Sequence, residues 1–87
     1  MHTVDLLERA LEAARQLGYE VRHEYMGGVG GGGCEFGGKK WLFVDLALNS
    51  VEQLDQVTKT LQVDPGIHFL SLPAELRRMC GISKRAA

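Results

Sequence analysis

Residues 37–46, GGKKWLFVDL, decide the fold of this 87-residue chain. From Trp41 onward, apolar side chains occupy both alternating positions of the segment instead of every second one. Such a run is typical of a strand at the centre of a sheet, where other elements cover both faces. We therefore expect a central strand over residues 39–48 that is buried above and below.

The two glycines that open this stretch are a hairpin signal. Tight two-residue turns between antiparallel strands need positive φ angles, which glycine adopts freely. With Gly37 and Gly38 as the turn, positions equally distant from it face each other across the two strands. One such pair joins opposite charges, which favours this register. The facing pairs are Gly33 with Leu42, Cys34 with Trp41, and Glu35 with Lys40.

The segments before the hairpin predict one helix and one strand. Apolar residues spaced three and four positions apart predict a helix over residues 4–17, which Gly18 ends. Strict alternation over residues 19–26 then predicts a strand with one buried and one solvated face. His23 falls on the predicted buried face, so we expect it to be a core histidine with a hydrogen-bond partner.

The segments after the hairpin predict two further helices. Ser50 and Gln53 match a capping box, and the apolar spacing that follows predicts a helix over residues 51–62. Residues 67–72 form either a short strand or a packed connection. Pro73 suits the first position of a third, short helix.

These elements predict one α+β domain spanning residues 1–87, in the order α-β-β-β-α-(β)-α, with helices packed on an antiparallel sheet. The length allows only a single domain, and a hydrophobic content of 45% is sufficient for a core. No apolar run is long enough to cross a membrane, and the first residues lack the pattern of a signal peptide. We expect a cytoplasmic protein with no membrane partner.

Charge is distributed unevenly along the chain, although the formal net charge is only −1. Residues 1–73 carry an excess of acidic side chains, and the basic excess lies in residues 74–87. We expect residues 82–87 to form a flexible basic tail. Its few basic side chains are far fewer than a nucleic-acid-binding surface needs, so nucleic acid is not an expected partner.

Residues 27–38 form a glycine-rich segment that holds eight of the eleven glycines. Gly28, Gly30 and Gly33 match the spacing of a dinucleotide-binding fingerprint, and Gly33 to Lys39 nearly matches a phosphate-binding loop. Both motifs function where a strand ends and a helix begins, whereas a strand follows here. The sequence therefore predicts no nucleotide and no other cofactor.

The chemistry-bearing side chains form no recognisable catalytic or metal motif. No CxxC, HxxxH or HExxH spacing occurs, so we predict no metal ligand and assign no catalytic residue. Cys34 is the one reactive residue type inside the glycine-rich segment, where uncovered backbone amides would stabilise a thiolate or hold an oxyanion. The alternative is that Cys34 is a small apolar side chain beside Trp41, and Cys80 is expected in the core.

Two segments carry a family resemblance. The Gly-Gly-Cys sequence that ends at Cys34 and the Phe-Val-Asp-Leu sequence of residues 43–46 resemble small bacterial proteins without an assigned activity. The order of helix, strands and capped helix is similar to the front half of ImmA/IrrE-type zinc peptidases. Those enzymes carry HExxH in the helix after the last strand, and residues 50–62 contain no histidine. The resemblance therefore implies a shared scaffold and no shared activity.

The glycine-rich segment and the aromatic strand lead to the main functional hypothesis. Paired beside the central strand, the glycines would leave a shallow trough on each face, one of them floored by Trp41 and Phe43. A partner backbone or a flat ligand would occupy this trough, or a helix of the same chain would fill it. The predicted binding residues are Gly30, Gly31, Gly32, Gly33, Cys34, Trp41 and Phe43.

We expect a non-enzymatic interaction module that assembles with copies of itself, because so small a core has apolar surface to spare. A separate protein partner is the other occupant considered. The alternative function is a thiol- or metal-dependent enzyme or sensor centred on Cys34, with His23 nearby.

Overall fold

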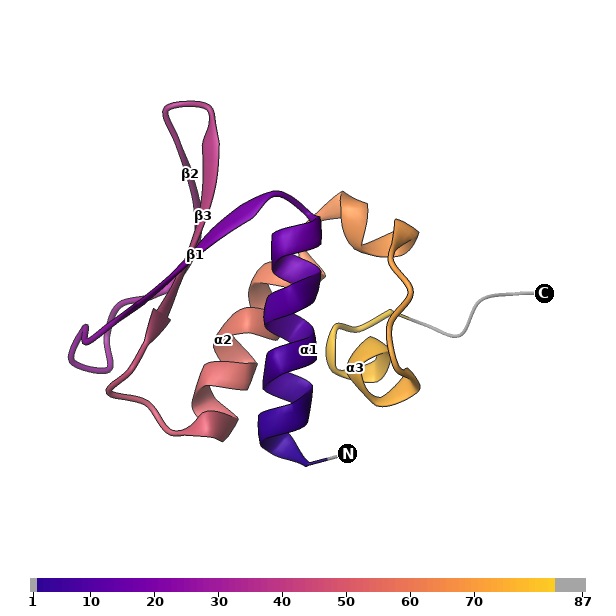
Figure 1. Ribbon diagram of the computed structural model, residues 1–87, viewed down its shortest axis with the longest axis horizontal. Helices are drawn as coiled ribbons and strands as arrows, with labels where there is room; N and C mark the ends of the chain where they lie inside the picture. Colours follow the sequence, from indigo (N-terminus) through magenta and orange to yellow (C-terminus); the bar gives the residue numbers. More distant parts are fainter. Residues whose placement is uncertain (1, 83–87) are drawn as a thin grey trace.

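The computed structural model describes residues 2–82, which form a layer of helices against a three-stranded sheet (Figure 1). The elements in chain order are α1 (Thr3–Gln16), β1 (Tyr19–Glu24), β2 (Gly32–Phe36), β3 (Lys39–Asp45), α2 (Ser50–Gln62), the 3-10 helix η1 (Pro65–Phe69) and α3 (Ala74–Met79). The predicted α+β class is confirmed. The basic tail predicted at residues 82–87 lies, apart from Ile82, outside the described residues.

The sheet has β3 at its centre, with β1 on one side and β2 on the other. Gly37 and Gly38 have φ angles of +61° and +77° and form the predicted turn. The antiparallel register of β2 and β3 is as predicted, with Cys34 opposite Trp41. β1, however, runs parallel to β3, so the sheet is mixed instead of antiparallel throughout. A tight turn constrains only β2 and β3, which leaves β1 free to pair with the other edge of the most apolar strand.

The helices α1 and α2 pack side by side on one face of this sheet (Figure 1). Both helices present apolar stripes, and the helix-facing side chains of β3, Leu42 and Val44, are fully buried beneath them. No helix within residues 2–82 is long and apolar enough to span a bilayer. The core consists of Leu6, Leu7, Ala10, Leu11, Ala13, Ala14, Leu42, Val44, Leu54, Val57, Leu61, Ile67, Leu76 and Cys80.

The other face of the sheet is not covered by any element of residues 2–82. The prediction that β3 is covered on both faces is therefore wrong, although its central position is confirmed. Trp41 and Phe43 point away from the helices and remain partly exposed. The helices form a single layer, and α1 and α2 both pack on the face of the sheet that carries Leu42.

Strand β1 is shorter and less buried than the sequence predicts. It ends at Glu24, and only Tyr19 and Val21 pack against the core. His23 is exposed, so its prediction as a core histidine is wrong. The reason is that α1 covers the first half of β1, so the last residues of the strand lie beyond the helix layer.

Helix α2 carries the expected capping box one residue earlier than predicted. Asn49 is the N-cap, and its side chain accepts a hydrogen bond from the Glu52 backbone N–H at 2.9 Å. The Glu52 carboxylate accepts one from the Asn49 backbone N–H at 3.0 Å. Ser50 is therefore the first helical residue and not the cap. The two short polar residues are adjacent, so the sequence pattern alone does not separate them.

Residues 67–72 contain no strand. Asp64 caps η1 by accepting a hydrogen bond from the Gly66 backbone N–H at 2.8 Å, and Ile67 is buried in the core. The remainder, from Leu70 to Leu72, is an extended connection into α3. The structure thus resolves the two predicted alternatives in favour of a packed connection.

Replacing Asn49 with Ala should reduce the free energy of unfolding by about 1 kcal/mol, because the backbone N–H of Glu52 loses the side-chain oxygen that accepts its hydrogen bond. Ser50→Ala is the matched control and should change the free energy of unfolding by less than about 0.5 kcal/mol. Urea denaturation followed by circular dichroism measures both values. A larger loss for Ser50→Ala than for Asn49→Ala would contradict the observed cap.

Candidate functional site

The glycine-rich segment begins as a loop that crosses the end of the sheet. β1 ends beside Asp45 and β2 begins beside Phe43, on opposite sides of β3, so the chain between them must pass over the end of the central strand. The Asp45 carboxylate lies under this crossing and is fully buried. It accepts hydrogen bonds from the backbone N–H groups of Met26, Gly28 and Ala47 at 2.9, 2.6 and 2.9 Å. Asp45 therefore holds the crossing loop in place.

The electrostatics of Asp45 fit this role. Burial acts to raise the pKa of its carboxyl, but the three donated hydrogen bonds outweigh burial and hold the pKa below its ordinary value. The carboxylate is thus ionised and its acceptor positions are occupied by the loop. A carboxylate committed in this way is a structural anchor and not a free acid or base.

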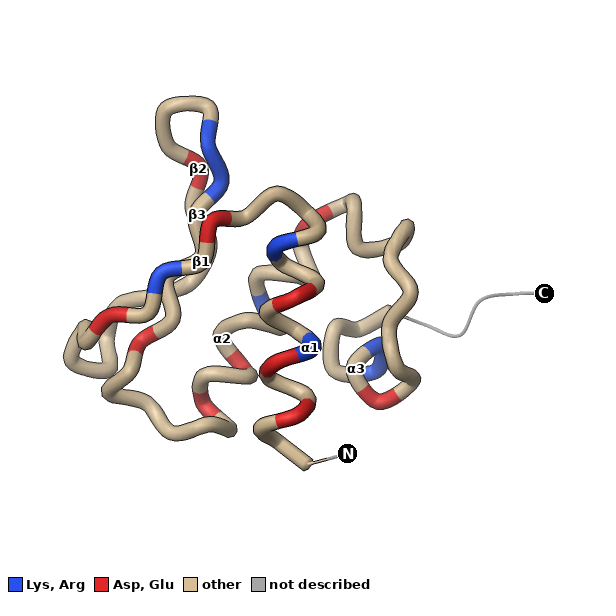
Figure 2. The backbone as a smooth tube through the Cα atoms, viewed as in Figure 1, with Lys and Arg blue, Asp and Glu red and all other residues tan. Residues whose placement is uncertain are grey.

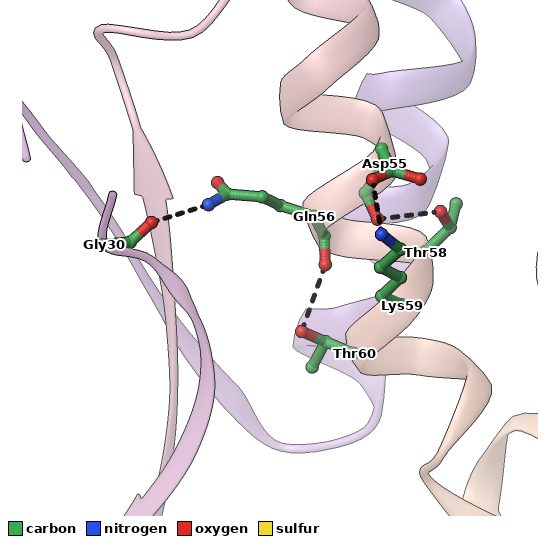
Figure 3. Close-up of polar contacts among 6 residues, drawn as sticks. All are labelled: Gly30, Asp55, Gln56, Thr58, Lys59 and Thr60. Atoms are coloured by element: carbon green, nitrogen blue, oxygen red, sulfur yellow. Dashed lines mark hydrogen bonds and ion pairs between the residues drawn. The ribbon is translucent and has the colours of Figure 1, made fainter. Parts of the chain in front are cut away.

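Gln56 of α2 holds the same loop from the helix side (Figure 3). Its side-chain Nε2 donates to the Gly30 carbonyl at 2.7 Å, and its Oε1 accepts from the Asp45 backbone N–H at 3.3 Å. One amide side chain therefore connects α2, the crossing loop and the end of β3. Sequence analysis missed both Asp45 and Gln56 in this role; an acidic residue ending an apolar strand was the available signal for the first.

Several predicted binding glycines serve packing and backbone geometry. A Cβ atom on Gly33 would lie 2.5 Å from Cγ2 of Thr60, and one on Gly31 would lie 2.5 Å from Nε2 of Gln56. Gly32 has a φ of +100°, which side chains rarely allow. α2 therefore fills the trough on the Leu42 face, which is the alternative that the sequence left open.

Gly33→Ala should lower the free energy of unfolding by about 1–3 kcal/mol, because the added methyl group collides with Thr60. Thr60→Ser removes the Cγ2 atom and keeps the hydroxyl that donates to the Gln56 carbonyl. The double variant Gly33→Ala/Thr60→Ser should therefore recover most of that loss, a non-additivity that a double-mutant cycle in urea measures. If the changes in the free energy of unfolding of the two single variants simply add, the contact with Thr60 is not what excludes a side chain at position 33.

A second polar cluster joins the start of β3 to the helix layer. Lys40 forms an ion pair with Asp64 at 2.8 Å and donates to the Leu17 carbonyl at 2.9 Å, and its ammonium lies 4.5 Å from the Tyr19 ring centre. Burial, followed by the hydrogen bond to Asp64, raises the pKa of Tyr19 to about 12. Burial opposes the ionisation of Asp64, but Lys40, Gly66 and Tyr19 together lower its pKa. The polar groups of Lys40, Asp64 and Tyr19 therefore bond to one another, and we call these three residues the Asp64 clasp.

The Asp64 clasp predicts a specific pH dependence. Because its pKa is lowered from an ordinary value of 3.8, Asp64 stabilises the fold above that value and loses this contribution as the pH falls through its folded-state pKa. Asp64→Asn should cost about 1–3 kcal/mol at pH 7. The difference between wild type and variant should narrow below about pH 4, as measured by urea denaturation. A difference in the free energy of unfolding that does not change with pH would contradict the lowered pKa of Asp64. Asp55→Asn is the control, because Asp55 forms an exposed ion pair with Lys59.

The uncovered face of the sheet gathers the remaining predicted binding residues. Cys34 and Phe36 of β2 lie on the same face as Trp41 and Phe43 of β3, because antiparallel partners share a face. The Trp41 and Phe43 rings are 6.1 Å apart with an interplanar angle of 17°, and Phe36 is 75% exposed. These side chains line an almost entirely apolar hollow together with Arg22 of β1. We call Cys34, Phe36, Trp41 and Phe43 the aromatic face.

Charged residues along β1 and at the start of β3 frame the aromatic face, and Figure 2 marks their positions on the backbone. Lys39 lies 5.0 Å from the Trp41 ring centre and pairs with Glu20 at 3.3 Å, while Arg22 pairs with Glu24 at 3.1 Å. The two ion pairs are about half exposed and cancel in charge. The frame therefore leaves the aromatic face without a strong net field.

The structure places the predicted binding residues in three different surroundings. Cys34, Trp41 and Phe43 come together on the aromatic face, whereas Gly31 and Gly33 face α2. Gly30 belongs to the crossing loop through its bond to Gln56. Sequence analysis missed Phe36 and Arg22 on the aromatic face, although the hairpin register it derived would have placed Phe36 there.

The described residues assemble no catalytic or metal-binding cluster. Among residues 2–82, no three or more His, Cys, Asp or Glu side chains converge in a way that could hold a metal ion. Cys34 and His23 lie on opposite faces of the sheet, because Cys34 pairs with Trp41 and His23 with Val44. The two are therefore not the neighbouring pair that the thiol hypothesis assumes.

Comparison of the chain with protein-family models, with curated proteins and with solved structures finds no match. The resemblance to a zinc-peptidase scaffold stays a prediction.

Proposed function

We propose that this protein is a non-enzymatic interaction module that binds a protein partner through its aromatic face. The observation that carries this proposal is the contrast between the two faces of β3: Leu42 and Val44 are fully buried, whereas Trp41 and Phe43 are covered by no other element of residues 2–82. Large aromatic side chains are enriched in the energetic centres of protein interfaces. A partner that covers this face accounts for their position.

The surroundings of the aromatic face indicate the chemistry of the partner segment. The hollow between Arg22, Phe36 and Trp41 is apolar, so it fits an aliphatic or aromatic side chain. The framing ion pairs leave no net charge to attract a strongly acidic or basic segment. The best ligand is therefore a neutral peptide segment with alternating apolar side chains.

The competing function is a thiol- or metal-dependent enzyme or sensor centred on Cys34. Cys34 is exposed and lines the apolar hollow with Phe36 and Trp41, and His23, which this hypothesis expects nearby, is on the other face of the sheet. These positions favour the interaction module. We place the module in the cytoplasm, where an exposed thiol stays reduced.

Selection of displayed random peptides on the immobilised protein tests the proposal. Peptides with alternating apolar residues should be enriched, and their binding should shift the fluorescence of Trp41, the single tryptophan. Phe43→Thr, which keeps strand propensity, should weaken binding at least about tenfold because it removes an interface anchor.

Phe69→Thr is the matched control, because Phe69 is 89% exposed and lies outside the sheet. It should leave peptide affinity unchanged. The absence of enriched peptides, or equal losses for Phe43→Thr and Phe69→Thr, would contradict the proposed function.

A further inference from the structure

The two edges of the sheet are protected very differently. The β1 edge carries Glu20, Arg22 and Glu24, and such charged side chains are a common device against unwanted strand pairing. The β2 edge has the sequence Gly32–Phe36, with Glu35 as its one charged residue (Figure 2). No strand within residues 2–82 pairs with the outer edge of β2. An exposed edge of this kind is a template for another strand.

The turn geometry determines which backbone groups of β2 face outward. The positive φ angles of Gly37 and Gly38 are those of a type I′ turn, which directs the Phe36 carbonyl toward Lys39. Backbone groups alternate along a strand, so those of Cys34 are also directed toward β3. The N–H and C=O groups of Gly33 and Glu35 are therefore directed to the free edge.

The sequence of β2 is complementary to itself in one antiparallel register. With Cys34 opposite Cys34 of a second copy, Gly33 lies opposite Glu35, so the outward-directed groups pair with one another. Phe36 then passes over the partner's Gly32, where no side chain obstructs it. The register also avoids placing the two acidic side chains directly opposite each other.

Charge supports the same register. Glu35 is on the helix side of β2, since it pairs with Lys40. In the register centred on Cys34 it lies beside the partner's Gly33, whose helix side is a hollow lined by Lys59 and Val63. The Lys59 side chain is 72% exposed and ion-pairs with Asp55, so its ammonium is accessible at this edge. A glutamate thus meets a lysine across the junction.

We propose that two copies of this chain pair through the outer edges of β2, in antiparallel register about Cys34, to form one continuous six-stranded sheet. The helices of both copies then lie on one side, and the two aromatic faces join on the other into a single binding surface. This inference rests on the proposed function for the role of that surface. The pairing itself depends on the backbone of β2 and not on Trp41 or Phe43.

Proline at position 35 tests the pairing directly. Its ring removes the outward N–H of Glu35 without touching the β2–β3 ladder, and proline is tolerated at such edge positions. In sedimentation velocity at about 100 µM, wild type should sediment at twice the 9.6 kDa chain mass and Glu35→Pro at 9.6 kDa. Glu35→Thr keeps the N–H and should remain a dimer. A monomeric wild type, or a dimeric Glu35→Pro, would overturn the proposal.

Thiol cross-linking tests the register and does not depend on the folding of the proline variant. In a Cys80→Ala background, diamide should convert wild-type Cys34 into a disulfide-linked dimer, because opposed residues of a non-hydrogen-bonded pair suit a disulfide. Cys34→Ser/Glu35→Cys places the thiol opposite the partner's Gly33 and should cross-link at least tenfold more slowly. Equal rates would overturn the register.

Phe43→Thr separates this inference from the proposed function. It should weaken peptide binding at least about tenfold and leave the dimer intact, because Phe43 lies on the central strand β3 and not at the outer edge of β2. A Phe43→Thr monomer would overturn the edge pairing in favour of a dimer packed face to face. Loss of the dimer in Glu35→Pro with peptide binding retained supports both statements.

Discussion

The structure depends on one topological constraint: the most apolar strand, β3, lies between two strands that precede it in the chain. The connection from β1 to β2 must therefore cross the end of β3, and the crossing backbone needs hydrogen-bond partners. Asp45, the last residue of β3, supplies them to Met26 and Gly28 from a fully buried position. Gln56 completes the arrangement by bonding the Gly30 carbonyl from α2.

This constraint explains why the glycines are concentrated in one segment. The crossing loop uses positive φ angles at Gly27 and Gly28, and the hairpin turn uses them at Gly37 and Gly38. Between these turns, Gly33 allows α2 to approach the sheet so closely that a methyl group would meet Thr60. The glycine-rich segment therefore combines a crossing, a close packing contact and a turn, each with its own physical requirement.

The same topology leaves one face of the sheet without a covering element among residues 2–82. α1 and α2 occupy one face of a sheet of only three strands, so the side chains of the other face, including Trp41, keep an accessible surface. The hairpin extends beyond the helix layer (Figure 1), which also leaves the outer edge of β2 open. Within residues 2–82, an uncovered face and an unpaired edge therefore lie on adjacent strands, β3 and β2.

The sequence by itself determined the local features of this protein. The hairpin register follows from Gly37 and Gly38, since a two-residue turn fixes which residues face each other, and the central position of β3 follows from its apolar run. Helical spacing determined α1 and α2 to within a residue or two at each end. The membership of Cys34, Trp41 and Phe43 in one cluster was predictable for the same local reason.

Only the tertiary structure decided the parallel pairing of β1, the uncovered aromatic face and the burial of Asp45. None of these is encoded in the spacing of neighbouring residues, because each depends on which segment occupies the space beside β3. The sequence pattern of an apolar strand is the same whether elements of the chain cover both of its faces or only one. Likewise, the sequence alone does not distinguish a buried aspartate such as Asp45 from a surface or catalytic one, because the loop whose backbone N–H groups donate to it is positioned only by the tertiary fold.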